Sequence, residues 1–560
     1  MQRDLTLVTQ ITGDWQRLRT RLRQLGDEIQ AGWENNAPSA LDAAGRLHFL
    51  SLFIIEPQGS CRALLVLEAS FDGRCPNPLT DESDQDQFIN ELVLANAPLL
   101  HELYASCANY PPDASDKQLR EYLKTWKHRS QLFYVGCPGL TTTRINEDAQ
   151  IAAEVEAAVL NLSPPIGRRA EIVREVFQSL SRPSRELVVN TPDRPFWVRH
   201  PLLEQPFQTL SWYAKWPLAL VGWTVLLLIL VEAYSPGWQP ERIAPPQAVV
   251  AATYCWFVFF LLAAGVLTLF WLMIWWGEFP QYLTRRMTYY VIGAKLEEYV
   301  CTSIRALPSF AAILGLLGLA HWQWARLWHL FMWGVALLLV GSLIALIVWY
   351  VRLLRIGLQE PSDRVFDLRW DTARLAAVRE REDRWAQTHL ISVTNIRRGV
   401  LRWVTLRCVL LSIHWLARIF YNPLGLFSTQ SIHFARWTII GGGRLVFISN
   451  YGGSFGGYLG IFATLGAAGV SAIWTNTEGF PRGFLLLGDG ARDEQPFKAR
   501  ARDSQVESLF WYRRYPRLSV ATIERNAAIR MELARFSSKG FQVPEAEFDV
   551  FLRRFATPTP

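Results

Sequence analysis

Apolar residues follow strand and helix periodicities in an ordered series near the start of the chain. Residues 5–11 alternate between apolar and polar as a half-buried strand does, and residues 14–29 place apolar side chains at helical spacing. Two apolar strands joined by a glycine-containing turn follow, and then an amphipathic helix over residues 86–100 and another short strand. The order strand, helix, strand, strand, helix, strand predicts a ferredoxin-like plait.

The same series returns near the C-terminus, which indicates an internal duplication. Residues 8–11 (VTQI) match residues 393–396 (VTNI), and a His-Phe pair opens the next strand in each copy, at His48 and at His433. Three further pairs of segments match in the same order: 63–73 with 443–453, 103–111 with 473–481, and 133–151 with 511–529. The last pair adds one strand and one helix to each plait.

Four long apolar runs occupy the middle of the chain: residues 216–234, 249–276, 309–322 and 327–351. An apolar helix of about 20 residues can cross a bilayer, so four membrane-spanning helices are expected. Arginine and lysine are concentrated between the second and third runs and after the fourth. By the positive-inside rule, both ends of the chain are expected on the cytoplasmic side of a bacterial inner membrane.

These patterns predict an α+β protein with two tandem ferredoxin-like (βαββαβ) domains, related by duplication and separated by a four-helix transmembrane insertion. The expected organisation is a first domain (1–160), a Pro-rich linker with a short helix (161–212), a transmembrane domain (213–355), a connector (356–388), a second domain (389–540) and a tail (541–560). Residues 401–420, the first helix of the second domain, combine many apolar residues with several arginines. Such a helix is expected to lie in the membrane interface or under the transmembrane domain, and a fifth span is the alternative.

Composition agrees with a chain that has both membrane and globular parts. Half of the 560 residues are hydrophobic and 19% are charged, with a net charge of +7. These figures exclude an intrinsically disordered chain, a collagen-like repeat and a small disulfide scaffold. The seven cysteines are scattered, without a CxxC pair, so neither a zinc cluster nor a disulfide framework is expected.

Two ferredoxin-like plaits in one chain resemble the dimeric α/β-barrel superfamily, which includes dye-decolorising peroxidases, chlorite dismutases and small monooxygenases. Residues 69–73 (ASFDG) keep Asp72 and Gly73 of the GxxDG motif, in which the aspartate of dye-decolorising peroxidases serves the distal face of haem. The second copy has no acidic residue at this point. Residues 432–483 are also similar to a recurring group of bacterial membrane proteins with tandem ferredoxin-like domains. The superfamily resemblance implies a pocket for haem or for a hydrophobic substrate.

The working site is expected in the second copy, because its strand ends and loops are richer in polar groups. His433 and Arg492 are the catalytic candidates: His433 as a ligand or general base, and Arg492 as a group that grips an anion. The candidates for ligand binding are Asn450, Tyr451, Trp474, Asn476 and Lys498. Each has a plainer interpretation as a packed core residue or a solvated turn, and His48 is expected mainly to serve packing.

Two classes of function remain open. In the first, the duplicated domain encloses haem or a small ligand and acts as a peroxidase- or monooxygenase-type oxidoreductase supplied from the membrane. In the second, it is a non-catalytic, membrane-associated binding or assembly module. The expected partners are a lipid bilayer, a hydrophobic small molecule and further copies of the chain in a homo-oligomer. Nucleic acid is not expected, because arginine carries nearly all of the positive charge, which fits an inner-membrane protein better. A metal ion is not expected either, since no metal-binding motif is present.

Overall fold

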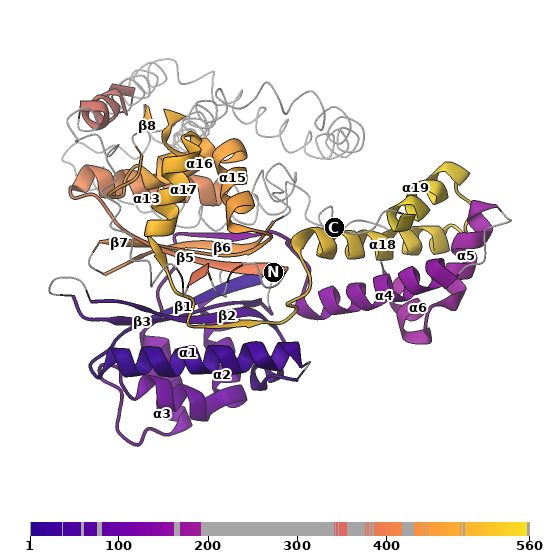
Figure 1. Cartoon of the computed structure of the whole chain (residues 1–560), viewed down its shortest axis with the longest axis horizontal. Helices are drawn as coiled ribbons and strands as arrows, with labels where there is room; N and C mark the ends of the chain where they lie inside the picture. The colour runs from indigo at the N-terminus through magenta and orange to yellow at the C-terminus, as the bar shows by residue number, and fades with distance from the viewer. Residues whose placement is uncertain are drawn as a thin grey trace, which may run out of the picture.

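The computed structural model describes residues 2–191 except 36, 58–60, 75–80 and 162–167; residues 341–355 except 342 and 345; residues 376, 378, 379, 382 and 386–416; and residues 431–556 except 442, 482 and 485–487. Within these residues the protein is α+β. Its main body has four layers, in the order helices, sheet, sheet, helices, and a bundle of helices extends from one side (Figure 1).

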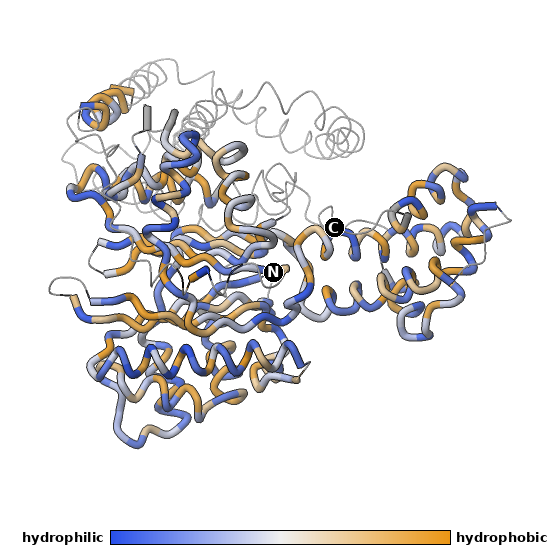
Figure 2. Tube along the Cα trace, viewed as in Figure 1, coloured by the Kyte–Doolittle hydropathy of each residue, from blue (hydrophilic) through white to orange (hydrophobic). Residues whose placement is uncertain are grey.

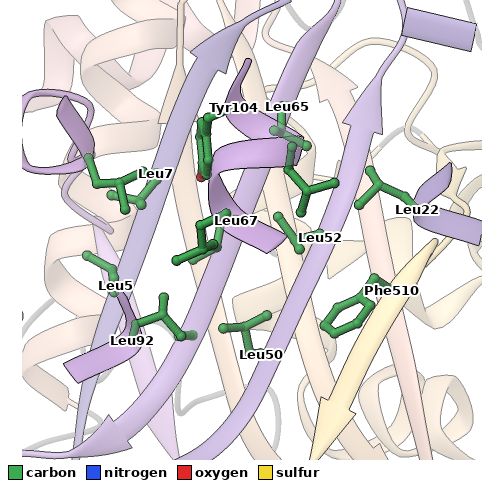
Figure 3. Close-up of a cluster of buried hydrophobic side chains, with 14 of the residues drawn as sticks. Leu5, Leu7, Leu22, Leu50, Leu52, Leu65, Leu67, Leu92, Tyr104 and Phe510 are labelled. Carbon is green, nitrogen blue, oxygen red and sulfur yellow. The ribbon is translucent and has the colours of Figure 1, made fainter. Parts of the chain in front are cut away.

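The first sheet is antiparallel and takes three of its four strands from the N-terminal half. Its order is β1 (Gln2–Gln10), β3 (Leu64–Asp72), β2 (Leu47–Ile55) and β11 (Phe510–Arg513). Leucines from these strands pack against the helices outside the sheet, together with Phe510 from β11 (Figure 3). The edge strand from the far end of the sequence therefore belongs to the core of the first half.

Three helices cover the outer face of the first sheet: α1 (Trp15–Glu34), α2 (Asp81–Tyr104) and α3 (Asp116–Thr125). A short 3-10 turn, η1 (Ala40–Ala43), precedes β2. Helix α1 begins at Asp14, whose carboxylate accepts hydrogen bonds from the backbone N–H groups of Gln16 (2.9 Å) and Arg17 (3.2 Å). Such a cap satisfies N–H groups that have no partner inside the helix.

The second sheet repeats this arrangement with strands of the C-terminal half and one strand of the N-terminal half. Its order is β10 (Gln505–Val506), β5 (Gln387–Asn395), β7 (Arg444–Gly452), β6 (Ile432–Ile440) and β4 (Leu132–Val135). The four strands from the C-terminal half are compatible with a ferredoxin-like plait.

Helices also cover the outer face of the second sheet: α13 (Val400–Leu416), α15 (Phe455–Leu465), α16 (Ala467–Trp474) and α17 (Glu494–Asp503). A short hairpin, β8 (Gly483–Phe484) with β9 (Gly488–Asp489), and the turn η8 (Gly490–Arg492) connect α16 to α17. Strands in both sheets are mostly hydrophobic along their length, whereas the covering helices alternate between hydrophobic and hydrophilic residues (Figure 2). This is the pattern of sheets buried on both faces and helices buried on one.

The two halves exchange one strand each. Strand β4 leaves the N-terminal half and pairs with β6, and β11 leaves the C-terminal half and pairs with β2. Leu132 of β4 is buried in the hydrophobic core of the second half, and Phe510 and Tyr512 of β11 are buried in that of the first. Each core therefore needs residues from the other half.

The helices that follow the exchanged strands form the side bundle. Helix α4 (Thr142–Asn161) packs against α18 (Val520–Ser538), as Figure 1 shows. The other members are α5 (Arg169–Ser179), α6 (Arg182–Val189) and α19 (Glu545–Ala556), which lie in the segments expected to be a linker and a tail. Their shared core contains Ile151, Val155, Val173, Phe177, Ile529, Leu533, Phe536, Phe548 and Phe551.

The expected fold class is wrong in its four-helix transmembrane insertion. No single helix in the described part of the chain is long and apolar enough to cross a membrane; one pair, Phe455–Thr464 with Ala467–Trp474, passes by composition but is bent by 95°. Burial on the second sheet explains the apolar character of this pair. The first three apolar runs, 216–234, 249–276 and 309–322, lie outside the described residues, as does most of the fourth.

Gly136 tests the strand exchange because it follows β4 directly. Its N–H donates to the carbonyl of His433 (2.8 Å), and a Cβ at this position would lie 1.8 Å from the carbonyl oxygen of Ile432. We expect Gly136→Ala to force β4 away from β6 and to lower the free energy of unfolding by about 1–3 kcal/mol. Gly45→Ala is the matched control, since a Cβ there meets nothing within 4 Å. Urea unfolding of the full chain measures both, and equal stabilities would contradict the pairing.

Candidate functional site

Matching β-bulges shape the space between the two sheets. The register of β2 on β3 shifts between Leu47 and Phe49, and that of β6 on β7 shifts between Ile432 and Phe434. A bulge turns two successive side chains to one face of a sheet. The two His-Phe pairs accordingly meet across the gap, with ring centroids 5.1 Å apart for His48 and Phe434 and 5.4 Å apart for Phe49 and His433.

The bulge also corrects an expectation about Arg436. It lies three positions after His433, and in a regular strand this odd spacing predicts opposite faces. The extra residue at the bulge instead turns both side chains toward the first sheet, where Arg436 donates to the backbone oxygens of Leu5 (2.9 Å) and Ala69 (3.0 Å).

His48 belongs to a continuous chain of hydrogen bonds. Its Nδ1 lies 2.7 Å from the hydroxyl of Tyr515, and its Nε2 lies 2.9 Å from Oδ1 of Asp72. The other oxygen of Asp72 accepts from the backbone N–H (2.8 Å) and the hydroxyl (3.1 Å) of Thr142. Burial alone raises the pKa of Asp72, but attraction to His48 and the hydrogen bonds outweigh it, and the pKa is lowered.

His433 lies at the equivalent position without these partners. Register places Cys137 where His48 has Tyr515, and Gly452 where His48 has Asp72. Among the described residues, Nε2 of His433 has no hydrogen-bond partner, and its ring packs against Phe49 and Tyr515. Burial, together with repulsion from His48, lowers the pKa of His433 to about 3, so the ring is neutral at pH 7.

An ion pair between Arg436 and Glu68 crosses the gap between the sheets. Arg436 Nη2 lies 2.9 Å from Oε2 of Glu68, and both side chains are almost fully buried. Glu68 also accepts from the hydroxyl of Ser51 (3.0 Å). Burial alone raises the pKa of Glu68, but the charge of Arg436 and the contact with His389 lower it overall. The carboxylate is therefore ionised, and its oxygens are engaged by Arg436 and Ser51.

Ser508, His389 and Glu68 form a row that resembles a nucleophilic relay. Nδ1 of His389 lies 2.6 Å from the Ser508 hydroxyl, and both residues border a small cleft beside Trp511. Nε2 of His389, however, is 3.5 Å from Glu68, which is longer than a hydrogen bond. Burial lowers the pKa of His389 despite this carboxylate. The row therefore fits a buried polar contact better than an activated serine.

The remaining ligand-binding candidates lie on both sides of the second sheet. Asn450 faces the first sheet and accepts a hydrogen bond from Nε1 of Trp511 (2.8 Å). The neighbouring Tyr451 points the other way and stacks on Tyr458, with centroids 3.8 Å apart. Trp474 also lies on the helix side, with its ring 5.2 Å from that of Phe447.

Three further candidates lie in the outer helical layer. Asn476 is buried at the end of α16, where its Nδ2 donates to the carbonyl of Ala472 (2.8 Å). Arg492 is exposed at the end of η8, and Lys498 pairs with Glu494 (2.5 Å) on α17. The structure therefore does not bring Arg492 together with His433, because the second sheet separates them.

Haem, which the superfamily resemblance implies, needs an axial ligand that faces an open cavity. Between the sheets, Phe49 and Tyr515 pack against the ring of His433, and both oxygens of Asp72 are engaged. Glu68 and Arg436 fill a further part of the gap. The described residues therefore do not fit a haem between the sheets.

A groove at the beginning of α13 was not predicted from the sequence. It is lined by Cys61, the segment 395–400, Trp403, Gly443, Arg444 and Glu478. Arg397 donates from its backbone N–H to the carbonyl of Asn476 (2.9 Å) and from Nε to that of Thr477 (3.0 Å). These hydrogen bonds fix the backbone and side chain of Arg397 at the edge of the segment that follows α16. The adjacent arginines at 397 and 398 were the sequence signal that could have indicated it.

Replacing His433 tests whether it supports stability or binding. In the unfolded chain a histidine gains a proton below pH 6.5, whereas folded His433 does so only near pH 3, so it lowers stability as the pH falls between these values. We expect His433→Met to match the wild type at pH 7 and to lose less stability on acidification to pH 4.5. Urea unfolding at the two pH values measures this, and an identical acid loss in both proteins would contradict it.

Removing one partner of the cross-sheet ion pair should be strongly destabilising. Glu68→Gln leaves Arg436 buried without its counter-charge, and we expect a loss of about 3–5 kcal/mol at pH 7. The loss should become smaller below pH 4.5, the ordinary pKa of glutamate. As the pH falls toward the lowered pKa of folded Glu68, the wild type itself loses the stabilisation that the carboxylate provides. The double variant Glu68→Leu, Arg436→Met should recover much of the stability. Equal losses in the single and double variants, measured by urea unfolding, would contradict this account.

Comparisons with known proteins found no relative of this chain. No family model matches the chain. A search of curated proteins and a search of solved structures found no match either. The fold and the candidate sites are therefore interpreted from the residues of this chain alone: two sheets that share exchanged strands, a committed polar cluster between them, and a basic groove beside α13.

Proposed function

We propose that this protein is a non-catalytic binding or assembly module that works at a membrane surface. The observation that carries the proposal is an exposed apolar stripe along α13, defined by Val400, Trp403, Val404, Cys408 and Leu411. Their spacing places all five on one face of the helix. The opposite face, which includes Leu406, Val409 and Leu410, is buried in the core of the second half.

The exposed fractions in the stripe are large for apolar side chains. Val400 is 79% exposed, Leu411 54%, Trp403 40% and Val404 38%. Arg407 lies among them with its guanidinium 3.8 Å from the centre of the Trp403 ring. A helix with an apolar face, a tryptophan and arginines at its border is typical of the interface between lipid headgroups and acyl chains.

A second apolar surface supports the same proposal. The helical stretch within residues 341–355 exposes Leu343, Ile344, Leu346, Ile347 and Val348, each by 42–54%. Figure 2 shows this stretch as mostly hydrophobic. Contiguous apolar surface of this kind is unfavourable in water and marks contact with lipid or protein. Arg352 and Arg355 follow it, and such basic residues are attracted to the anionic lipids of a membrane surface.

The polar cluster between the sheets favours a binding or assembly role over an oxidoreductase. Its acidic groups are engaged by His48, Thr142 and Arg436, and the neutral ring of His433 is enclosed. Such a cluster suits the joining of two halves more than the turnover of a substrate. A bacterial inner membrane, a hydrophobic ligand and homo-oligomers stay predictions under this proposal.

Cys408 provides a natural probe of the stripe. The other six cysteines are replaced, a nitroxide label is attached to Cys408, and the full chain is studied in membranes of the cell that expresses it. We expect the label to collide more often with oxygen, which concentrates in lipid, than with a water-soluble nickel complex. The control is a chain whose only cysteine is introduced by Leu160→Cys, because Leu160 is 75% exposed on α4 in the side bundle and should show the reverse preference.

Two results would contradict bilayer contact. Equal accessibility of both labelled positions to the nickel complex would place the stripe in water. A label at Cys408 that is shielded from both oxygen and nickel would place it against protein.

A further inference from the structure

Helices α1 and α13, the first helices of the two halves, have different residues at their N-termini. Helix α1 has the carboxylate of Asp14 at its N-terminus, where it accepts from two backbone N–H groups. The paired segments 8–11 and 393–396 place Gly399 at the equivalent position before α13. Gly399 has φ +116° and no side chain to cap the helix, and the first turn of α13 holds no acidic residue. A negative group that is built into the first half is therefore missing from the second.

Three arginines surround the position of the missing carboxylate. Arg397 and Arg398 replace Thr12 and Gly13 of the first half. Arg444, the first residue of β7, replaces Leu64, the first residue of β3, as the matched strand registers show. All three line the groove defined above. The second half has thus exchanged one intramolecular anion for three cations.

Arg444 is the strongest indication that this groove takes a ligand. The residue is only 4% exposed, and its Nε donates to the carbonyl of Gly441 at 3.4 Å. Its Nη1 is buried and has no hydrogen-bond partner among the described residues. A buried guanidinium nitrogen without a partner costs free energy, which an anion in the groove would remove. One acidic residue, Glu478, also lines the groove, and it accepts from Nδ2 of Asn395 at 3.4 Å.

We propose that the groove binds the phosphate group of an anionic phospholipid, an inference that rests on the proposed membrane function. Phosphate offers several acceptor oxygens, which suits guanidinium groups together with the backbone N–H groups at the start of a helix. A lipid is favoured over free phosphate because Val400 and Trp403 line the groove and also begin the exposed stripe of α13. The headgroup would bind beside the arginines while its acyl chains follow the stripe.

The test compares lipid retention and phosphate binding in the full chain, purified in neutral detergent. Native mass spectrometry would count bound phosphatidylglycerol and, separately, phosphatidylcholine, and calorimetry would measure inorganic phosphate. Two variants weaken the site: Arg444→Leu, which restores the residue of the first half, and Arg398→Gln, which changes an exposed side chain and spares the fold. Arg182→Gln is the control for charge, because Arg182 is 90% exposed on α6.

We expect the wild type to retain phosphatidylglycerol in preference to phosphatidylcholine and to release it when phosphate is added. Each site variant should bind about tenfold more weakly, the usual effect of one lost hydrogen bond from a charged group. Arg182→Gln should behave as the wild type. Glu478→Gln should bind more tightly, because it removes the one negative charge on the groove.

Two outcomes would overturn the inference. Equal retention of both lipids by the wild type and by both site variants would show that headgroup phosphate is not recognised; the membrane proposal would still stand or fall on the nitroxide at Cys408. Phosphate binding that both site variants lose, without a preference between the two lipids, would make the ligand a free phosphate and overturn the lipid assignment.

Discussion

The reciprocal exchange of β4 and β11 is the constraint on which the rest of the structure depends. Each exchanged strand completes the other half's sheet, so neither hydrophobic core can form alone. The exchange also sets the two sheets face to face and sends α4 and α18 out of the body together, which creates the side bundle. The cross-sheet pair of Arg436 and Glu68 then stabilises one relative position of the sheets, because a buried charge tolerates no displacement from its partner.

The two halves repeat one framework, but the charged groups buried between their sheets differ. The matched registers make Ile448 the equivalent of Glu68 and Ser51 the equivalent of Arg436, so each charge of the cross-sheet pair has a neutral counterpart in the other half. The chain through His48 is likewise absent around His433. The pair of Arg436 and Glu68 therefore takes one charge from each half and forms where the two sheets meet.

Local hydrophobic periodicity predicted the first strand, the first helix and the two paired strands of each half. The short strand expected at residues 103–104 was wrong, because these residues form the end of α2. The sequence did not predict the exchange, because β4 (Leu132–Val135) and β11 (Phe510–Arg513) have four residues each and their partners lie hundreds of positions away. The bulge that turns His433 and Arg436 to one face adds a single residue to strand β6, and it cannot be recognised in the pattern of hydrophobic and polar residues. Residues 455–474 resemble a membrane segment only because they are buried on a sheet.

The outer surfaces of the two halves have diverged more than their sheets. On α1, Arg19, Arg21 and Arg23 pair with Glu56, Glu102 and Glu507, which makes a solvated face with its charges balanced inside the molecule. On α13, the exposed face is apolar, and arginines gather where the helix begins. Since both helices occupy the same place on equivalent sheets, the fold does not require this difference. An apolar face that is exposed to water costs free energy, and so does a buried cation without a partner. Contact with an amphipathic, negatively charged surface removes both costs. The apolar face of α13 and the arginines at its start therefore favour a binding surface on the second half.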